Sequence, residues 1–372
     1  MAITETYVDV VDGDDGTGDG LAEVSAYKTL QYALDNTTRN TTDHNFFYIK
    51  NGATQTLTGS IGLGTYGKPT LNARLNFVGY ETTVGDLGRV HFNCGGFAFY
   101  PGTFDDYFCF SNLKLTNWGT SWAISLDNDV SVTNCELDGG GTSNGYMRFD
   151  QRIAIVGNYM HNPGTGTSEA GLKVDEDSLV LSNYIVHNYR VIYLPTCIAS
   201  SVMYNVVILD TPTSASSAGI HANGSPSTIC NNTIIREGGS ASGAEGIYSL
   251  NDYALRIMNN YVEGFSGAAD IAINPSTSDC AVYGNNKFYN NTTNFDDTTG
   301  HILVNIGVDE TLGSSGVDAN YLPTADLQNA GWPSSFATAT PTYNTVGSVI
   351  AEQGGGGAAG LMRQPNTNGG FQ

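Results

Sequence analysis

Carboxylates recur at matched intervals in the middle of the chain. Asp127 is followed by Asp150 and then by Asp175, at steps of 23 and 25 residues. If each step is one coil of a repeating fold, these side chains stack about 5 Å apart. Stacked carboxylates repel one another, which raises their pKa values or recruits a hard cation such as Ca²⁺. The predicted calcium ligands are Asp127, Asp129, Asp150, Asp175 and Asp177.

The same positions form the best catalytic candidate in the chain. Arg148 and Arg152 flank Asp150, so acidic and basic side chains fall within one coil. Such pairs can move protons, which makes Asp150, Asp175, Arg148 and Arg152 the candidate catalytic residues. The plainer interpretation is a solvated acidic edge, in a chain whose formal net charge is −21.

Three tyrosines, Tyr159, Tyr184 and Tyr261, each directly follow an asparagine of a repeat. They predict either an exposed aromatic strip for ligand binding, on which sugars stack, or a stabilising stack within the fold. His161 and His187 fall at similar places in adjacent repeats, but two histidines are too few for a metal site. We expect them to be stacked polar residues.

The elements that position these residues follow from one recurring asparagine. It stands at Asn112, Asn134, Asn158, Asn183, Asn205, Asn232, Asn260 and Asn286, with spacings of 22, 24, 25, 22, 27, 28 and 26 residues. Apolar residues flank it on both sides in most repeats, which is typical of two short strands joined at a corner. Asparagine tolerates left-handed backbone, and its amide can bond to the same residue one coil away. We therefore predict that all eight asparagines lie in file.

This repeat predicts an all-β fold, a right-handed parallel β-helix with three short sheets and about 25 residues per turn. Residues 1–40 are predicted to be an N-terminal cap, with a short helix that buries Leu30, Ala33 and Leu34 on one face. The acidic loop from Gly13 to Gly20 is predicted to be a plain turn. Residues 41–331 form the β-helix.

Residues 332–372 are rich in Ser, Thr and Gly and form a C-terminal extension. Its last part holds Leu361, Met362, Arg363 and Phe371 among glycines, too few apolar residues for a core. The segment is either disordered or a peptide that docks on a partner or a sister chain.

Composition excludes several function classes. With 15 basic against 36 acidic residues, the surface repels phosphate backbones and anionic membranes, so no nucleic acid and no membrane are expected as partners. No apolar run approaches the ~20 residues of a membrane span. No secretory signal is visible at the N-terminus, which predicts folding in the cytoplasm unless a signal was removed. The six cysteines are dispersed, which disfavours zinc and predicts reduced core residues.

The asparagine-anchored coils from 100 to 295 resemble the pectin-lyase-like superfamily of parallel β-helix proteins. Hydrolases of that superfamily carry Asn-Thr-Asp and Gly-His-Gly motifs, which do not occur here. Its lyases use a calcium-binding aspartate cluster with a basic proton acceptor, which the resemblance would place at Asp150 and Arg152. The opening Tyr7–Leu34 segment resembles entry segments of bacteriophage β-helix proteins, and the Gly360–Gly370 tail looks like the C-termini of phage structural proteins.

These observations favour a non-enzymatic structural or binding component of a phage virion, either a tail fibre or spike or a capsid decoration. It would assemble in the host cytoplasm and need no cofactor. Its expected partners are other virion proteins, surface polysaccharide and copies of itself, with a homotrimer implied by the resemblance. The alternatives are an extracellular polysaccharide lyase or glycoside hydrolase working at the acidic corner, and a secreted carbohydrate-binding adhesin.

Overall fold

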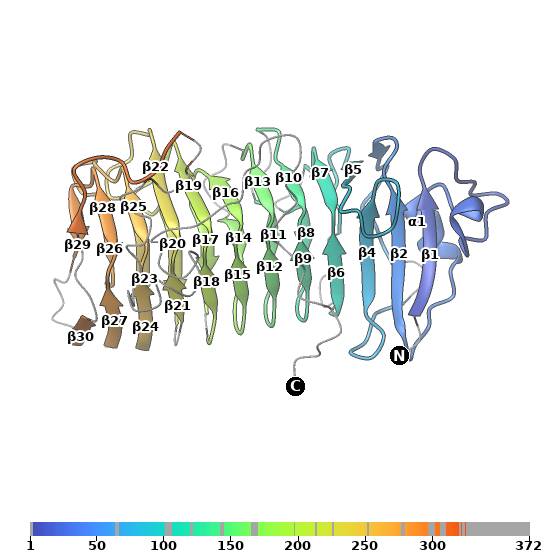
Figure 1. Cartoon of the computed structure of the whole chain (residues 1–372), viewed down its shortest axis with the longest axis horizontal. Coiled ribbons are helices and arrows are strands. Elements are labelled where there is room, and N and C mark those ends of the chain that lie inside the picture. Colours follow the sequence, from blue (N-terminus) through green and yellow to red (C-terminus); the bar gives the residue numbers. More distant parts are fainter. Residues whose placement is uncertain are drawn as a thin grey trace.

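The computed structural model describes most of the chain as far as Thr324. The described residues are 3–63, 67–100, 106–119, 122–141, 145–164, 170–196, 198–212, 214–224, 227–250, 253–276, 280–296, 302–305, 310–319, 321 and 324. Their strands follow one another along a single long axis, from β1 at one end to β30 at the other (Figure 1). All pairs of named strands are parallel and join successive coils, so the predicted parallel β-helix with three sheets is confirmed.

Within the described residues, the first sheet contains 12 strands. In spatial order they are β1 (Ile3–Asp9), β2 (His44–Lys50), β4 (Leu75–Tyr80), β6 (Phe108–Ser111), β9 (Ser131–Thr133), β12 (Ala154–Val156), β15 (Leu179–Leu181), β18 (Ser201–Met203), β21 (Thr228–Cys230), β24 (Tyr253–Met258), β27 (Cys280–Gly284) and β30 (Ile302–Asn305). Each strand bonds to the coils before and after it, so unpaired edges arise only at the two ends.

The second sheet contains 11 strands and follows the first around each coil. They are β3 (Gln55–Thr56), β5 (Val90–Asn93), β7 (Leu113–Thr116), β10 (Glu136–Asp138), β13 (Tyr159–His161), β16 (Tyr184–His187), β19 (Val206–Asp210), β22 (Thr233–Glu237), β25 (Tyr261–Glu263), β28 (Lys287–Tyr289) and β31 (Glu310–Thr311). In most coils a single corner separates the first sheet from the second.

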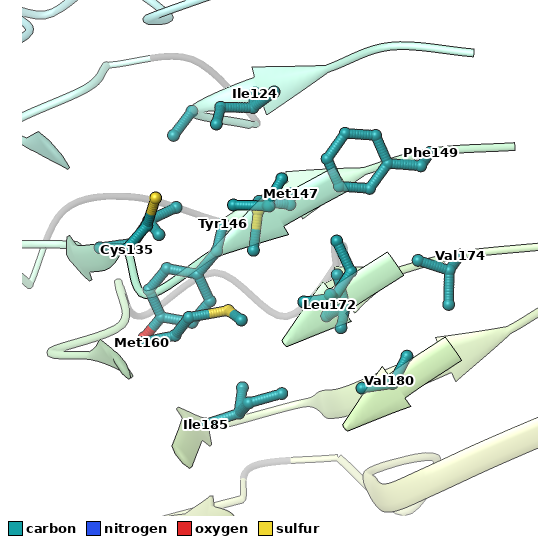
Figure 2. Packing of buried hydrophobic residues seen from close by; sticks show 14 of the residues in the cluster. Ile124, Cys135, Tyr146, Met147, Phe149, Met160, Leu172, Val174, Val180 and Ile185 are labelled. Carbon is teal, nitrogen blue, oxygen red and sulfur yellow. The ribbon is translucent and has the colours of Figure 1, made fainter. Parts of the chain in front are cut away.

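The third sheet closes the coil with eight strands. They are β8 (Ile124–Ser125), β11 (Met147–Arg148), β14 (Ala170–Lys173), β17 (Arg190–Leu194), β20 (Ala218–Asn223), β23 (Glu245–Leu250), β26 (Ile271–Asn274) and β29 (Thr293–Phe295). Inward side chains from all three sheets meet in one interior, as Val180, Ile185 and Leu172 do in Figure 2. All three are fully buried, and the period of two that strands impose leaves every second residue facing outward.

Helix is scarce in the described residues. The 3-10 turn η1 spans Glu23–Ser25, and α1 spans Leu30–Asn36 after Thr29, whose side chain accepts the Tyr32 N–H as an N-cap. The helix buries Leu30, Ala33 and Leu34, which join the main core. Its role as a cap over the first coil stays a prediction. None of the described helices is long and apolar enough to cross a membrane.

Six of the eight predicted asparagines form a ladder. The prediction is wrong for Asn112 and Asn134, which lie outside this ladder. Asn158, Asn183, Asn205, Asn232, Asn260 and Asn286 lie in file, each between 0 and 1% exposed. In each of the first five, the main-chain N–H and Nδ2 both donate to Oδ1 of the next, at 2.9–3.1 Å. At the start of this file, Cys135 donates its N–H to Asn158 Oδ1 at 2.9 Å.

Asn112 and Asn134 lie one residue earlier in their coils, at the corner itself. Strand pairing matches Glu136 with Tyr159, so Asn134 corresponds to Gly157 and not to Asn158. Both asparagines have positive φ, 58° and 52°, and Gly157 at 67° shares that conformation. The corner therefore needs a residue that tolerates left-handed backbone, which asparagine and glycine supply.

A returning C-terminal segment covers part of the second sheet from outside. We call residues 312–319 together with Tyr321 the strap. Its Val317 and Tyr321 pack on Val206, Ile208 and Ile235, which are buried although they face away from the main core. Figure 1 shows this orange segment running back toward β22. Consecutive apolar residues in β19 and β22 are the sequence signal of strands covered on both faces.

The predicted reduced cysteines are confirmed at the four positions whose side chains the structure describes. Cys94, Cys109, Cys135 and Cys230 are free, and all but the half-buried Cys109 are buried. Cys197 and the side chain of Cys280 lie outside the described part. Most residues after Tyr321 also lie outside it, and so does the whole 332–372 extension, including Leu361, Met362, Arg363 and Phe371.

Candidate functional site

The acidic corner consists of two files of side chains instead of one. Bridges pair Asn128 with Gln151 and Gln151 with Glu176, which fixes the register of three coils. One file therefore holds Asp127, Asp150 and Asp175, whose main chains are linked by N–H to O bonds of 2.8 and 3.1 Å. The other file holds Asp129, Arg152 and Asp177, all with positive φ. The predicted stacking is thus present for Asp127, Asp150 and Asp175.

Arg152 belongs to the second file and is already paired. Its Nε and NH2 atoms donate to the two carboxylate oxygens of Asp129 at 3.1 and 2.7 Å. A guanidinium held this way compensates the charge of Asp129. Arg148 lies at the exposed end of β11, in register with Lys173. The two arginines predicted to flank Asp150 therefore have different surroundings.

Asp175 is the perturbed acid of this corner. Burial raises its pKa to about 6, and the charge of Asp150 adds to this effect while Lys173 opposes it. Its Oδ1 atom is buried and has no hydrogen-bond partner among the described residues, while a hydrogen bond from Thr196 partly opposes the rise in pKa. A carboxyl in this state holds its proton into the mildly acidic range.

The five predicted calcium ligands do not gather into a ligand cluster. Among the residues that the structure describes, no group of three or more His, Cys, Asp or Glu side chains is arranged to hold a metal ion. The physical reason is the division into two files, one of which is interrupted by Arg152. Calcium binding at Asp127, Asp129, Asp150, Asp175 and Asp177 stays a prediction.

Two of the three tyrosines stack on each other, and Tyr184 also packs on Tyr321 of the strap, with ring centroids 6.0 Å apart. Their role as ligand-binding residues stays a prediction. Tyr159 and Tyr184 are paired in adjacent strands, with ring centroids 5.0 Å apart, and both are half-buried. Tyr261 lies farther along, beyond Val206 and Thr233 in the same file.

Tyr261 is 0% exposed, so its prediction as an exposed binding residue is wrong. The strap covers it: its hydroxyl donates to Glu263 at 2.5 Å and accepts the N–H of Gly316 at 2.6 Å.

Ionic groups surround the tyrosine pair. Glu136, which pairs with Tyr159 across one coil, lies 2.8 Å from Lys114 Nζ, 3.4 Å from Arg89 NH1 and 3.3 Å from His161 Nε2. The hydrogen bond from His161, aided by Lys114, lowers the pKa of Glu136 to about 2 against the opposing effect of burial. The His161 ring also stacks on Tyr159, with centroids 4.3 Å apart.

We call Arg89, Lys114, Glu136, Tyr159, His161 and Tyr184 the tyrosine face. Sequence reasoning did not single out Arg89, Lys114 or Glu136 as site residues. The available signal was that Lys114 and Glu136 interrupt an otherwise apolar column two residues after the asparagine. Their charged side chains face outward because asparagine stands one residue earlier in those coils.

The predicted stack of His161 and His187 is not formed. Tyr159 pairs with Tyr184 and Met160 with Ile185, so the residue opposite His161 is Val186. His187 lies one residue farther along the strand. His187 is 0% exposed, its Nδ1 accepts the N–H of Tyr189 at 3.2 Å, and its ring meets Tyr146 at 6.1 Å. It is a packed interior residue.

Comparisons with known proteins add the following. No protein-family model matches the chain, and no curated protein matches it. Among solved structures it is similar to pectate lyase Pel9A, with 14% identity, TM-score 0.42, and 91% of this chain and 85% of that chain covered. It is also similar to the GH136 lacto-N-biosidase from Eubacterium ramulus, with 13% identity, TM-score 0.41, and coverage of 82% and 67%.

A third similar structure is ORF18 of Geobacillus virus E2, with 12% identity, TM-score 0.34, and coverage of 83% and 62%. At these identities the likenesses concern the β-helix and assign neither activity nor substrate to this chain. The function is therefore argued from its own residues.

Proposed function

We propose that this protein is a non-enzymatic binding and structural component of a phage particle that contacts surface glycans through the tyrosine face. The observation that carries this proposal is the half-buried pair of Tyr159 and Tyr184, 5.0 Å apart on an outward sheet face and bordered by charged groups. Aromatic faces stack on the C–H surfaces of sugars, and Glu136, Lys114 and His161 offer hydrogen-bond partners for hydroxyls.

The fold suits a structural role. The buried asparagine ladder links six successive coils, and every interior strand is bonded on both edges. A rod of this kind holds its side chains in fixed positions. Binding of a glycan along the tyrosine face therefore costs little free energy for rearrangement of the protein. The proposal of a virion location rests on the resemblance of the two chain ends to phage proteins.

The enzymatic alternative at the acidic corner is less favoured. A proton acceptor must be free to take a proton, whereas Arg152 forms a bidentate ion pair with Asp129. Burial raises the pKa of Asp175 to about 6, so this carboxyl keeps its proton into the mildly acidic range. Depolymerisation of an acidic polysaccharide that is abolished by Asp150→Ala or Arg152→Ala would establish the enzyme instead.

Glycan-array binding by the full chain tests the proposal. We expect Tyr159→Ala to weaken binding of the retained glycans by about tenfold, because one stacking contact contributes roughly 1.5 kcal/mol. Tyr48→Ala is the matched control, since Tyr48 is also a half-buried outward tyrosine, paired with Tyr7 at 5.6 Å on the first sheet. Equal losses in both variants, or no glycan retained by the wild type, would remove the binding role.

The virion location has a separate test. Phage particles are purified from cells that make either the full chain or a chain lacking residues 354–372, and an antibody then detects the chain in them. The first preparation tests the location, and the second tests whether these residues anchor the chain to the particle. We expect the full chain to co-purify with particles and the shortened chain to be lost from them. A chain that never co-purifies with particles would leave the carbohydrate-binding adhesin as the better description.

A further inference from the structure

The outer face of the third sheet holds an arginine that has no counter-ion among the residues that the structure describes. Arg190, at the start of β17, lies over the rings of Tyr189 and Tyr193, with its guanidinium carbon 4.9 and 4.6 Å from their centroids. Its Nε atom is buried and, within the described part of the chain, has no hydrogen-bond partner. Contacts with two aromatic faces hold a guanidinium in place while leaving its N–H edge able to bond.

A buried histidine lies in the next coil. Strand pairing aligns Tyr193, His221 and Tyr248 on β17, β20 and β23, which are neighbours in Figure 1. The His221 ring meets the two tyrosine rings at 4.9 and 4.7 Å and is 7% exposed. Its Nδ1 atom is buried without a partner among the described residues. Leaving such an atom unsatisfied is costly, so buried polar atoms in native proteins nearly always bond to the protein, to water, to an ion or to a ligand.

The electrostatics around these two nitrogens favour a negative ligand. Burial lowers the pKa of His221 to about 3, and the positive charge of Arg190 adds to this effect. Lys173 pairs with Tyr193 and continues the same file, so a second cation borders the site. The acidic residue Glu245 lies two coils from Arg190, with Ala218 between them in the register. Its carboxyl group accepts a hydrogen bond from Asn274 Nδ2 at 2.6 Å.

We propose that Arg190 and His221 form a binding site for an oxyanion group, a carboxylate, sulfate or phosphate, carried by a ligand that lies against Tyr193 and Tyr248. The group accepts hydrogen bonds from the Arg190 guanidinium, whose charge-assisted bonds are among the strongest in proteins. It also satisfies Nδ1 of His221, which donates in the appropriate tautomer. The site lies on a different sheet from the tyrosine face and stands or falls independently of the proposed function.

Calorimetric titration of the full chain with sodium acetate, sulfate and phosphate tests this site, with sodium chloride at equal ionic strength as the reference. We expect at least one of the three oxyanions to bind above the chloride background, and the one that binds best identifies the group. Arg190→Gln and His221→Phe should each weaken that binding by about ten- to a hundredfold. Arg256→Gln, which removes one exposed charge from β24 of the first sheet, should leave it unchanged.

Three outcomes would overturn the proposal: no oxyanion binds above chloride, Arg190→Gln binds as tightly as the wild type, or Arg256→Gln weakens binding equally. The last would show a general charge effect instead of a site. Circular dichroism establishes that each variant is folded. If His221→Phe does not fold, Arg190→Lys decides, because it keeps the charge but loses the Nε donor and should bind several-fold more weakly than the wild type.

Discussion

Asn183 donates two hydrogen bonds to a single oxygen of Asn205, from its main-chain N–H at 2.9 Å and from its Nδ2 at 3.0 Å. Both residues are 0% exposed. The same arrangement repeats along six coils, so each asparagine satisfies main-chain and side-chain groups that water cannot reach.

Asn205→Ala should therefore be strongly destabilising. It leaves the main-chain N–H of Asn183 without its acceptor, and the carbonyls of Val180 and Met203 without the Asn205 Nδ2 donor, at about 1–3 kcal/mol for each unsatisfied group in a dry interior. We expect a total loss of about 3 kcal/mol or more, measured as a lower midpoint of thermal or urea unfolding.

The matched control is Asn134→Gly. Asn134 is half-buried at a corner with φ of 52°, a conformation that glycine adopts freely. The substitution also removes the hydrogen bonds of the Asn134 side chain with Arg89 and Asn112. We therefore expect a loss of about 1–2 kcal/mol, smaller than that of Asn205→Ala. Similar effects of the two substitutions would contradict the distinction between ladder and corner asparagines.

The strap predicts a second, local effect. Val317→Asp places a charge against Val206 and Ile208 and should detach the strap without unfolding the coils beneath it. We expect increased binding of a hydrophobic dye, because the outward apolar patch becomes exposed, with little change in the circular dichroism spectrum. Val24→Asp is the control, since Val24 is 99% exposed; a rise in dye binding there too would exclude a strap-specific cause.

The ion pair at the acidic corner should contribute little stability. Arg152 is 48% exposed in its side chain, so its pairing with Asp129 is screened by water. Arg152→Gly also removes a side chain from a left-handed corner residue, φ 56°. We expect the unfolding free energy to change by less than about 1 kcal/mol, with a near-constant thermal midpoint. A larger loss would mean that Arg152 supports the corner in a way that its exposure does not indicate.

The coiled architecture was predictable because it depends on local rules. Inward apolar residues recur at every coil, and a small set of residue types tolerates the corner conformation. The one-residue error at Asn112 and Asn134 has a physical origin. Asparagine serves two adjacent positions, the left-handed corner and the buried ladder, and pairs such as Asn231 and Asn232 fill both. A coil with a single asparagine does not indicate which position it occupies.

The site residues were harder to predict because their surroundings come from distant segments. Tyr159 and Tyr261 follow asparagines in the same way, yet one is half-buried and the other fully buried. The difference is the strap, whose Gly316 lies 55 residues from Tyr261 in sequence. Likewise, the pairing of Arg152 with Asp129 depends on the register between coils, which sequence spacing gave only to within a residue.

Glu245 predicts an unusual dependence of stability on pH. Burial raises its pKa to about 7, the nearby Asp296 adding to this and the hydrogen bond from Asn274 opposing it. In the unfolded chain a glutamic acid titrates near a pKa of about 4.3. The folded state therefore binds more protons between these values, and the unfolding free energy must fall as pH rises across that window. Burial of Asp175, with its pKa near 6, acts in the same direction.

Glu245→Gln should remove part of this slope. Glutamine stays neutral at all pH values and its Oε1 can still accept from Asn274 Nδ2, so the variant should match the wild type near pH 4 and exceed it by about 1–3 kcal/mol near pH 8. Unfolding midpoints measured from pH 4 to pH 8 provide the comparison. Glu81 is exposed, so the unfolding midpoint of Glu81→Gln should change with pH in the same way as that of the wild type. A Glu245→Gln profile parallel to the wild type would mean that this carboxyl titrates alike in the folded and unfolded chains.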